Sequence, residues 1–215
     1  MPETAGTRES YNYLGVAKKL VFYVPPQISP FGFYLRAAVY VVLFIWGSKF
    51  IFTPMESNYA GRSFLHLVNL PFHEAGHVFF GFFGQFIGSL GGSLGQLLMP
   101  LICLFAMFVT TGDTFGASVC LWWFGENFLD IAPYMDDANE LTMMLLGGNT
   151  GSSSPYGFHD WEYILTEAGL YRYTDVLARA TFAAGAFIMV LSLVWGGILL
   201  LKQYGSLKEQ VGKTE

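Results

Sequence analysis

The sequence predicts an all-α fold: a polytopic bundle of about five transmembrane helices, with one more helix lying at the membrane interface. Of the 215 residues, 53% are hydrophobic and only 13% are charged, about half the charged share of an ordinary soluble domain. The mean hydropathy is +0.43. Apolar runs also recur at about the 20-residue length that a helix needs to cross the hydrocarbon core.

The same composition excludes other classes of protein. Intrinsic disorder requires low hydrophobicity and high net charge, and this chain is hydrophobic with a net charge of −5. The 11 Lys and Arg residues are scattered and the isoelectric point is about 5.3, so nucleic acid is not an expected partner. The lipid bilayer is the first expected partner.

The chain divides into three parts. Residues 1–30 mix charges, Tyr and Pro, and predict an arm outside the membrane. Residues 31–201 predict a single membrane domain, interrupted by a polar loop over residues 133–173. Residues 202–215 predict a short solvated tail.

Five apolar segments predict the spans, at residues 31–52, 64–90, 93–110, 115–131 and 176–201. Pro71 predicts a kink or a helix start within the second segment, and Gly91-Gly92 predict a sharp turn before the third. Within the polar loop, residues 161–170 predict a short interfacial helix. Five spans would place the two ends of the chain on opposite faces of the membrane.

The second apolar segment carries a motif with chemical content, His73-Glu74-Ala75-Gly76-His77. In this H-E-x-x-H sequence, a spacing of four places both imidazoles on one helix face, where they can bind one Zn²⁺ ion. Glu74 lies at the edge of that face, where it can act as general base toward a water activated by the metal. The motif predicts zinc ligands at His73 and His77, and a catalytic residue at Glu74.

The cost of polar groups in a bilayer favours this interpretation. A charged residue at mid-bilayer costs at least about 2.5–3.5 kcal/mol on insertion scales, and the second to fourth segments contain no Lys or Arg to pair with Glu74. A bound divalent cation or a water-filled site would offset that cost. The alternative is that His73 and His77 only form hydrogen bonds with neighbouring helices.

The third metal ligand is open among four residues. His159 is preferred, because it lies outside the second segment, in a turn before a predicted helix, and imidazole is a common zinc ligand. Asp130, at the end of the fourth segment, is the next candidate. Asp137 and Asp160 are further carboxylates, although Asp160 could instead cap the helix that begins at Trp161.

These features resemble the site-2-protease-type membrane zinc metallopeptidases, and more closely their compact bacterial relatives. The resemblance rests on four stretches: HEAGH at 73–77, GSLGGSLGQLLMP at 88–100, YMDDA at 134–138 and HDW at 159–161. The best-known members take a third ligand from the Asp of an LDG-like motif. In this chain, Leu129-Asp130-Ile131 matches only its first two residues.

The resemblance implies an intramembrane zinc metallopeptidase, with a membrane-anchored peptide or protein as its substrate. It also implies a location in the bacterial cytoplasmic membrane. Two other functions are compatible with the same residues. One is a non-catalytic metal-binding membrane protein with a sensor or structural role. The other is a small transporter or scaffold whose His and Glu residues line a proton path.

Overall fold

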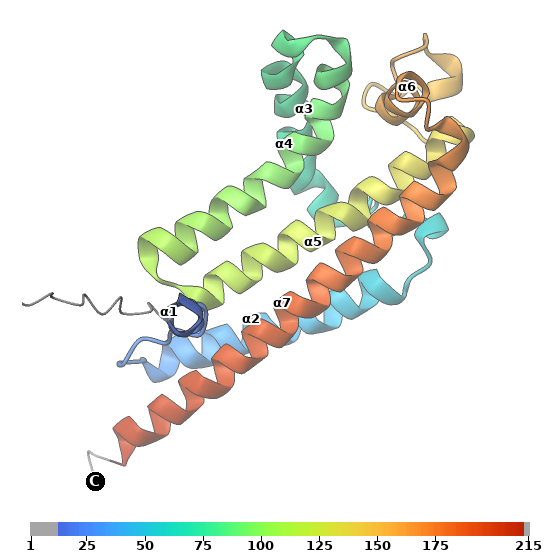
Figure 1. The fold of residues 1–215 in the computed structure, drawn as a ribbon. Helices are drawn as coiled ribbons and strands as arrows, with labels where there is room; N and C mark the ends of the chain where they lie inside the picture. Colours follow the sequence, from blue (N-terminus) through green and yellow to red (C-terminus); the bar gives the residue numbers. More distant parts are fainter. Residues whose placement is uncertain (1–12, 213–215) are drawn as a thin grey trace, which may run out of the picture.

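The computed structural model describes residues 13–212, and every long element within them is a helix (Figure 1). The seven α-helices are α1 (Tyr13–Val21), α2 (Pro30–Phe52), α3 (Phe64–Phe80), α4 (Gln85–Phe105), α5 (Thr114–Asp136), α6 (Asp160–Glu167) and α7 (Thr174–Val211). The predicted all-α class is confirmed for this part of the chain. The first twelve residues of the predicted arm, and residues 213–215 of the predicted tail, lie outside the described residues.

Three helical segments are long and apolar enough to cross a membrane, and they indicate a membrane protein. They are Pro30–Phe52, Gln85–Thr111, in which a π-helical turn extends α4, and Tyr171–Val211. The prediction of five spans is not confirmed. Helix α3 has 17 residues, and α5 has sufficient length but carries polar side chains such as Glu126, Asn127 and Asp130.

The second and third predicted spans have different boundaries in the structure. Helix α3 ends at Phe80, and the chain turns over residues 81–84, where Gly84 has a φ of +98° that glycine adopts readily. Helix α4 then runs unbroken through Gly91 and Gly92, so the turn predicted at these two glycines is wrong. Pro71 lies within α3 and neither starts nor ends it.

The glycines of α4 allow α3 to pack against it backbone to backbone. A Cβ atom on Gly76 of α3 would overlap the carbonyl oxygen of Gly91, and one on Gly91 would lie 2.6 Å from the carbonyl oxygen of Gly76. Small residues at such positions let membrane helices approach closely. Gly91 therefore lies in the interface between α3 and α4, at the place where the sequence predicted a turn.

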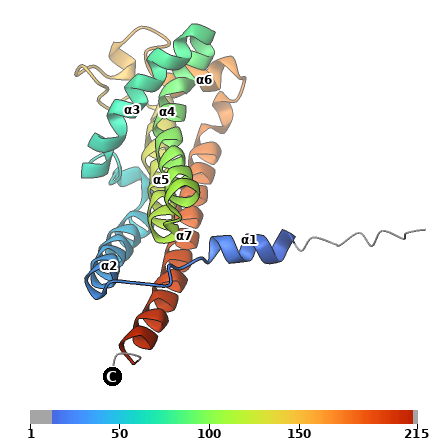
Figure 2. The ribbon, with the colours of Figure 1, turned by 90° about the vertical axis from the view of Figure 1, so that its left-hand side faces the viewer.

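Both ends of the described chain lie near the same end of the bundle (Figure 1). Helix α1 runs crosswise to α7 (Figure 2). At its C-terminal end, Trp195 and Lys202 of α7 donate hydrogen bonds to the carbonyl oxygens of Val21 and Phe22. The predicted placement of the two ends on opposite faces is not observed. Residues 202–211, expected as a solvated tail, continue α7 and bury Leu207.

The polar residues of interest gather at the other end of the bundle. There the α3–α4 hairpin, the end of α5 and the start of α6 meet, beside the loop that joins α5 to α6 (Figures 1 and 2). Helices α5 and α7 pack together along their length below this region, around buried Leu129 and Met189. Large apolar side chains such as Phe52 and Phe82 point outward, at 84% and 90% exposure, as expected for a surface that faces lipid.

Candidate metal centre

Two histidines of α3 and one aspartate of α6 converge on a common point. The Nε2 atoms of His73 and His77 lie 3.3 Å and 3.2 Å from Oδ2 of Asp160. One potential ligand atom from each residue lies within 4.8 Å of the other two. The imidazole centroids are 4.7 Å apart, which confirms that the i, i+4 spacing places both rings on one face of α3.

Helix α4 orients both imidazoles through their other nitrogen. His77 Nδ1 lies 2.8 Å from the backbone carbonyl oxygen of Gly88, and His73 Nδ1 lies 2.7 Å from the side-chain Oε1 of Gln96. A carbonyl oxygen can only accept a hydrogen bond, so each Nδ1 carries a proton and donates it. In a neutral imidazole, Nε2 then has no proton and presents its lone pair.

In this arrangement a positive charge is needed between the two rings and the Asp160 carboxylate. Two Nε2 lone pairs facing a carboxylate oxygen at hydrogen-bond distance would repel it unless positive charge lies between them. A proton on each Nε2 would supply that charge, and so would one cation shared by all three atoms. A set of two imidazole nitrogens and one carboxylate oxygen, with the rings fixed by outer hydrogen bonds, suits Zn²⁺.

Asp160 is held in place by Tyr134 at the end of α5. The Tyr134 hydroxyl donates to Asp160 Oδ2 at 3.2 Å and accepts from the Asp160 backbone N–H at 3.1 Å. Burial alone would raise the pKa of the Asp160 carboxyl, but the facing imidazoles of His73 and His77 lower that pKa to about 2. The carboxyl is therefore ionised near neutral pH, as a metal ligand must be.

A cavity of about 400 Å³ opens beside these residues, and Glu74 lies in its wall. Glu74 is half-buried. Part of the cavity wall comes from the loop after α5, through residues 143–146. Glu74 is therefore placed beside the ligand cluster and not within it, as the motif predicts.

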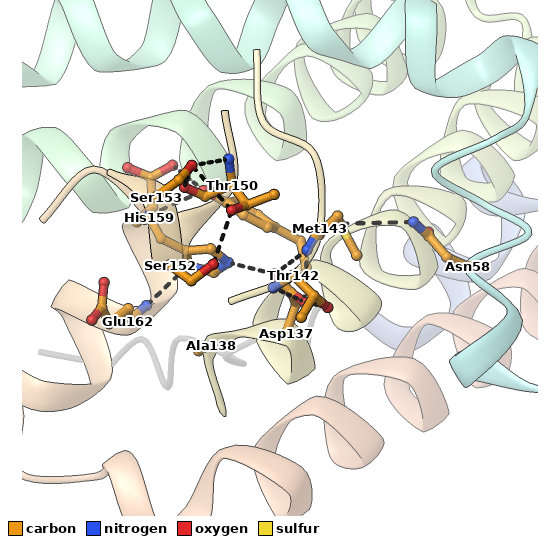
Figure 3. Close-up of polar contacts among 12 residues, drawn as sticks. Asn58, Asp137, Ala138, Thr142, Met143, Thr150, Ser152, Ser153, His159 and Glu162 are labelled. Atoms are coloured by element: carbon orange, nitrogen blue, oxygen red, sulfur yellow. Dashed lines mark hydrogen bonds and ion pairs between the residues drawn. The ribbon is translucent and has the colours of Figure 1, made fainter. Parts of the chain in front are cut away.

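The preferred third ligand, His159, does not join His73 and His77 in the structure. Its imidazole is fully buried, and its Nε2 lies 3.3 Å from Oδ2 of Asp137 (Figure 3). Asp160, the next residue, takes the position that the sequence analysis gave to His159. Asp160 is also the first residue of α6 and not its cap, because the cap is His159.

The other two carboxylate candidates also lie apart from the cluster. Asp130 faces His66, at 2.9 Å between Oδ1 and Nδ1, and accepts a hydrogen bond from the Asn69 amide at 3.2 Å. His66 and Asp130 line the same cavity but form a separate polar pair. Burial alone would raise the pKa of the Asp137 carboxyl, but the facing His159 and the neighbouring N–H groups lower it.

Three supporting residues lie in stretches that carry the resemblance, but their contacts were not predicted from the sequence. Gln96 could have been found, because an amide within an apolar segment usually marks a hydrogen-bond partner. Tyr134 stands in the YMDDA stretch but gave no sign of its hydroxyl contact. The carbonyl of Gly88 carries no sequence signal, since every residue has one.

No family model, curated protein or solved structure matches this chain.

Proposed function

We propose that the protein is a membrane-embedded, zinc-dependent metallopeptidase that hydrolyses peptide bonds of membrane-associated substrates. The observation that carries the proposal is the convergence of His73, His77 and Asp160 in a cavity whose wall contains Glu74. Three protein ligands with a fourth position left open are typical of catalytic zinc sites. A purely structural zinc site would be closed by a fourth protein ligand.

The residues of this chain take separate roles in the proposed reaction. Zn²⁺ bound there would polarise the scissile carbonyl and lower the pKa of a water toward 7. Glu74 removes a proton from the attacking water and returns it to the leaving amine. Gln96 and the Gly88 carbonyl keep both Nε2 atoms directed at the site.

The proposed substrate is a peptide segment of a membrane-anchored protein. The cavity opens at one end of a bundle that contains three candidate spanning helices, and its wall combines polar ligands with apolar side chains of residues 143–146. Such a lining accommodates a polypeptide backbone together with apolar side chains. With the resemblance of HEAGH and its neighbouring stretches, this supports a bacterial cytoplasmic membrane protein of the site-2-protease type.

The metal content of detergent-purified protein tests the proposal. We expect about one zinc per wild-type chain, and none in a His73→Ala/His77→Ala double variant. His66→Ala is the matched control, because His66 lines the same cavity but pairs with Asp130. Folded wild-type protein that lacks metal after purification without chelators would contradict the proposal and assign the cluster to proton or structural chemistry.

A Gly92→Ala variant is expected to weaken zinc binding by about 10-fold or more, the range seen when groups around a metal are disturbed. Gly92 of α4 faces the two ligands, and a Cβ there would lie 2.5 Å from Nε2 and 2.6 Å from Cε1 of His77. The imidazoles would have to move off the common point. Zinc affinity can be measured by competition with a chromophoric chelator.

Gly205→Ala is the control for this substitution. Gly205 lies in α7, and no atom lies within 4 Å of the Cβ that alanine would add, outside the backbone of its own helix. Its zinc affinity should equal that of the wild type. A Gly92→Ala protein with unchanged affinity would show that the space between the two imidazoles is not the metal position.

A further inference from the structure

We propose that His159 is a positioning residue: by fixing the start of α6, it holds Asp160 at the candidate metal centre. This inference rests on the proposed zinc site and assigns a role to the one histidine of the chain outside α3. His159 and Asp160 are adjacent in sequence, but their side chains point to different partners. Asp160 faces His73 and His77, and His159 faces the loop after α5.

His159 fixes the start of α6, on which Asp160 stands. It is the N-cap residue of this helix, with extended backbone angles, and its Nδ1 accepts a hydrogen bond from the Glu162 backbone N–H at 3.2 Å. An N-cap acceptor satisfies a backbone donor that has no partner within the helix. Asp160 is the first helical residue, so the cap determines the position of its Cα atom and the direction of its side chain.

The second nitrogen of His159 lies beside Asp137. Because Nδ1 accepts a hydrogen bond, the proton of the neutral imidazole lies on Nε2, which is 3.3 Å from Asp137 Oδ2 (Figure 3). The ring is fully buried, Nδ1 has a hydrogen-bond partner, and Nε2 lies beside the Asp137 carboxylate without the geometry of a hydrogen bond. Neither nitrogen is directed at the point shared by His73 and His77.

Asp137 joins this support to the wall of the cavity. Its carboxylate also accepts hydrogen bonds from the backbone N–H groups of Thr142 and Met143, at 3.1 Å and 3.0 Å. Met143 begins the loop segment that lines the cavity. One carboxylate thus holds the cavity wall and lies beside the imidazole that caps α6.

Tyr134 completes the support from the side of α5. Its ring centroid lies 4.4 Å from that of His159, and its hydroxyl contacts both the carboxylate and the backbone N–H of Asp160. The imidazole therefore packs on the same residue that hydrogen-bonds the ligand. Loss of the imidazole removes the cap of α6 and the ring that packs against Tyr134.

Substitutions at position 159 separate a positioning role from a ligand role. Asparagine is among the best N-cap residues, because its short side chain places an oxygen where Nδ1 lies, but it is not a typical zinc ligand. Glutamine reaches the position of Nε2 beside Asp137 and fills most of the ring volume, but its longer side chain is not a favoured N-cap. Alanine provides neither contact.

The experiment measures zinc affinity by chelator competition for the wild type and for His159→Ala, His159→Gln and His159→Asn. We expect alanine and glutamine to weaken zinc binding by about 10- to 100-fold, as loss of an outer partner does, and asparagine to stay within a few-fold of wild type. The absorption spectrum of the Co²⁺-loaded protein should change with alanine and glutamine and be preserved with asparagine.

Ser29→Ala serves as the control for a lost helix cap. Ser29 caps α2 through a hydrogen bond from the Gly32 N–H at 3.0 Å, and it is exposed. This variant should lose a similar amount of stability but keep the wild-type zinc affinity and Co²⁺ spectrum. If His159→Ala does not fold, the glutamine and asparagine variants carry the comparison.

Two results would overturn the positioning role. Equal loss of affinity with asparagine and glutamine would show that the helix cap is not what positions Asp160, and unchanged affinity with alanine and glutamine would show no role at all. Absence of zinc from the wild type is a different result, and it would contradict the proposed function itself.

Discussion

A Glu74→Gln protein is expected to bind zinc as the wild type does and to hydrolyse peptide bonds at least about 100-fold more slowly. Glutamine keeps the size and shape of the side chain but cannot accept a proton from water. Glu74 lines the cavity beside the ligand cluster. Turnover can be followed as the release of fragments from single-pass transmembrane segments fused to a fluorescent protein, reconstituted in liposomes with the purified protein.

Glu140→Gln is the matched control for this substitution. Glu140 follows the end of α5 at the same end of the bundle, but it is exposed and does not line the cavity. Its turnover should equal that of the wild type. A Glu74→Gln protein with wild-type turnover would eliminate Glu74 as general base, and with it the proposed mechanism.

Asp160→Asn should weaken zinc binding by more than about 100-fold, beyond the effect expected for an outer partner. Asparagine preserves the shape of the side chain, but its neutral amide loses the charge that faces His73 and His77 at 3.3 Å and 3.2 Å. Chelator competition measures the affinity, and the absorption of Co²⁺-loaded protein reports the change in ligand set.

Asp130→Asn provides the comparison for Asp160→Asn. Asp130 is also buried, but it pairs with His66 and Asn69 away from the ligand cluster. Zinc affinity in this variant should stay within a few-fold of wild type. If the two variants exchange behaviour, the third ligand is Asp130 and α6 must be arranged differently around the metal.

The local part of the candidate site was predictable, because it depends on one helix. The spacing of His73 and His77 alone places their rings on one face of α3, and the structure brings the rings together as expected. The position of Glu74 at the edge of that face follows from the same geometry. Nothing beyond residues 73–77 is needed for this inference.

The helix boundaries around the motif were not predictable from the same patterns. Gly91 and Gly92 look like a turn in an apolar sequence, but the flexibility that favours a turn also allows close packing of two helices. The structure uses them for packing, and places the turn at residues 81–84. Only the partner helix decides between the two uses, and the local sequence does not contain it.

The preference for His159 over Asp160 as the third residue of the cluster did not match the structure, for a similar reason. His159 and Asp160 are neighbours, so residue type favoured the histidine, yet at a helix start consecutive side chains point in different directions. His159 turns back to cap α6, and Asp160 projects from its first turn toward α3. The choice between them depends on where α6 docks, which is a property of the whole bundle.

The contacts of the two histidines differ widely in the length of chain that they close. His77 meets the Gly88 carbonyl across 11 residues, whereas His73 meets Asp160 across 87. Loop-closure entropy makes the longer connection about 2 kcal/mol more costly than the shorter one. The positions of the His73 and His77 imidazoles are thus a local property of the α3–α4 hairpin. Asp160 joins them only when α5, the loop and α6 are all in place. The position of Asp160 therefore depends on the whole fold, and a substitution far from the cavity that shifts α5, the loop or α6 is expected to displace this carboxylate from His73 and His77.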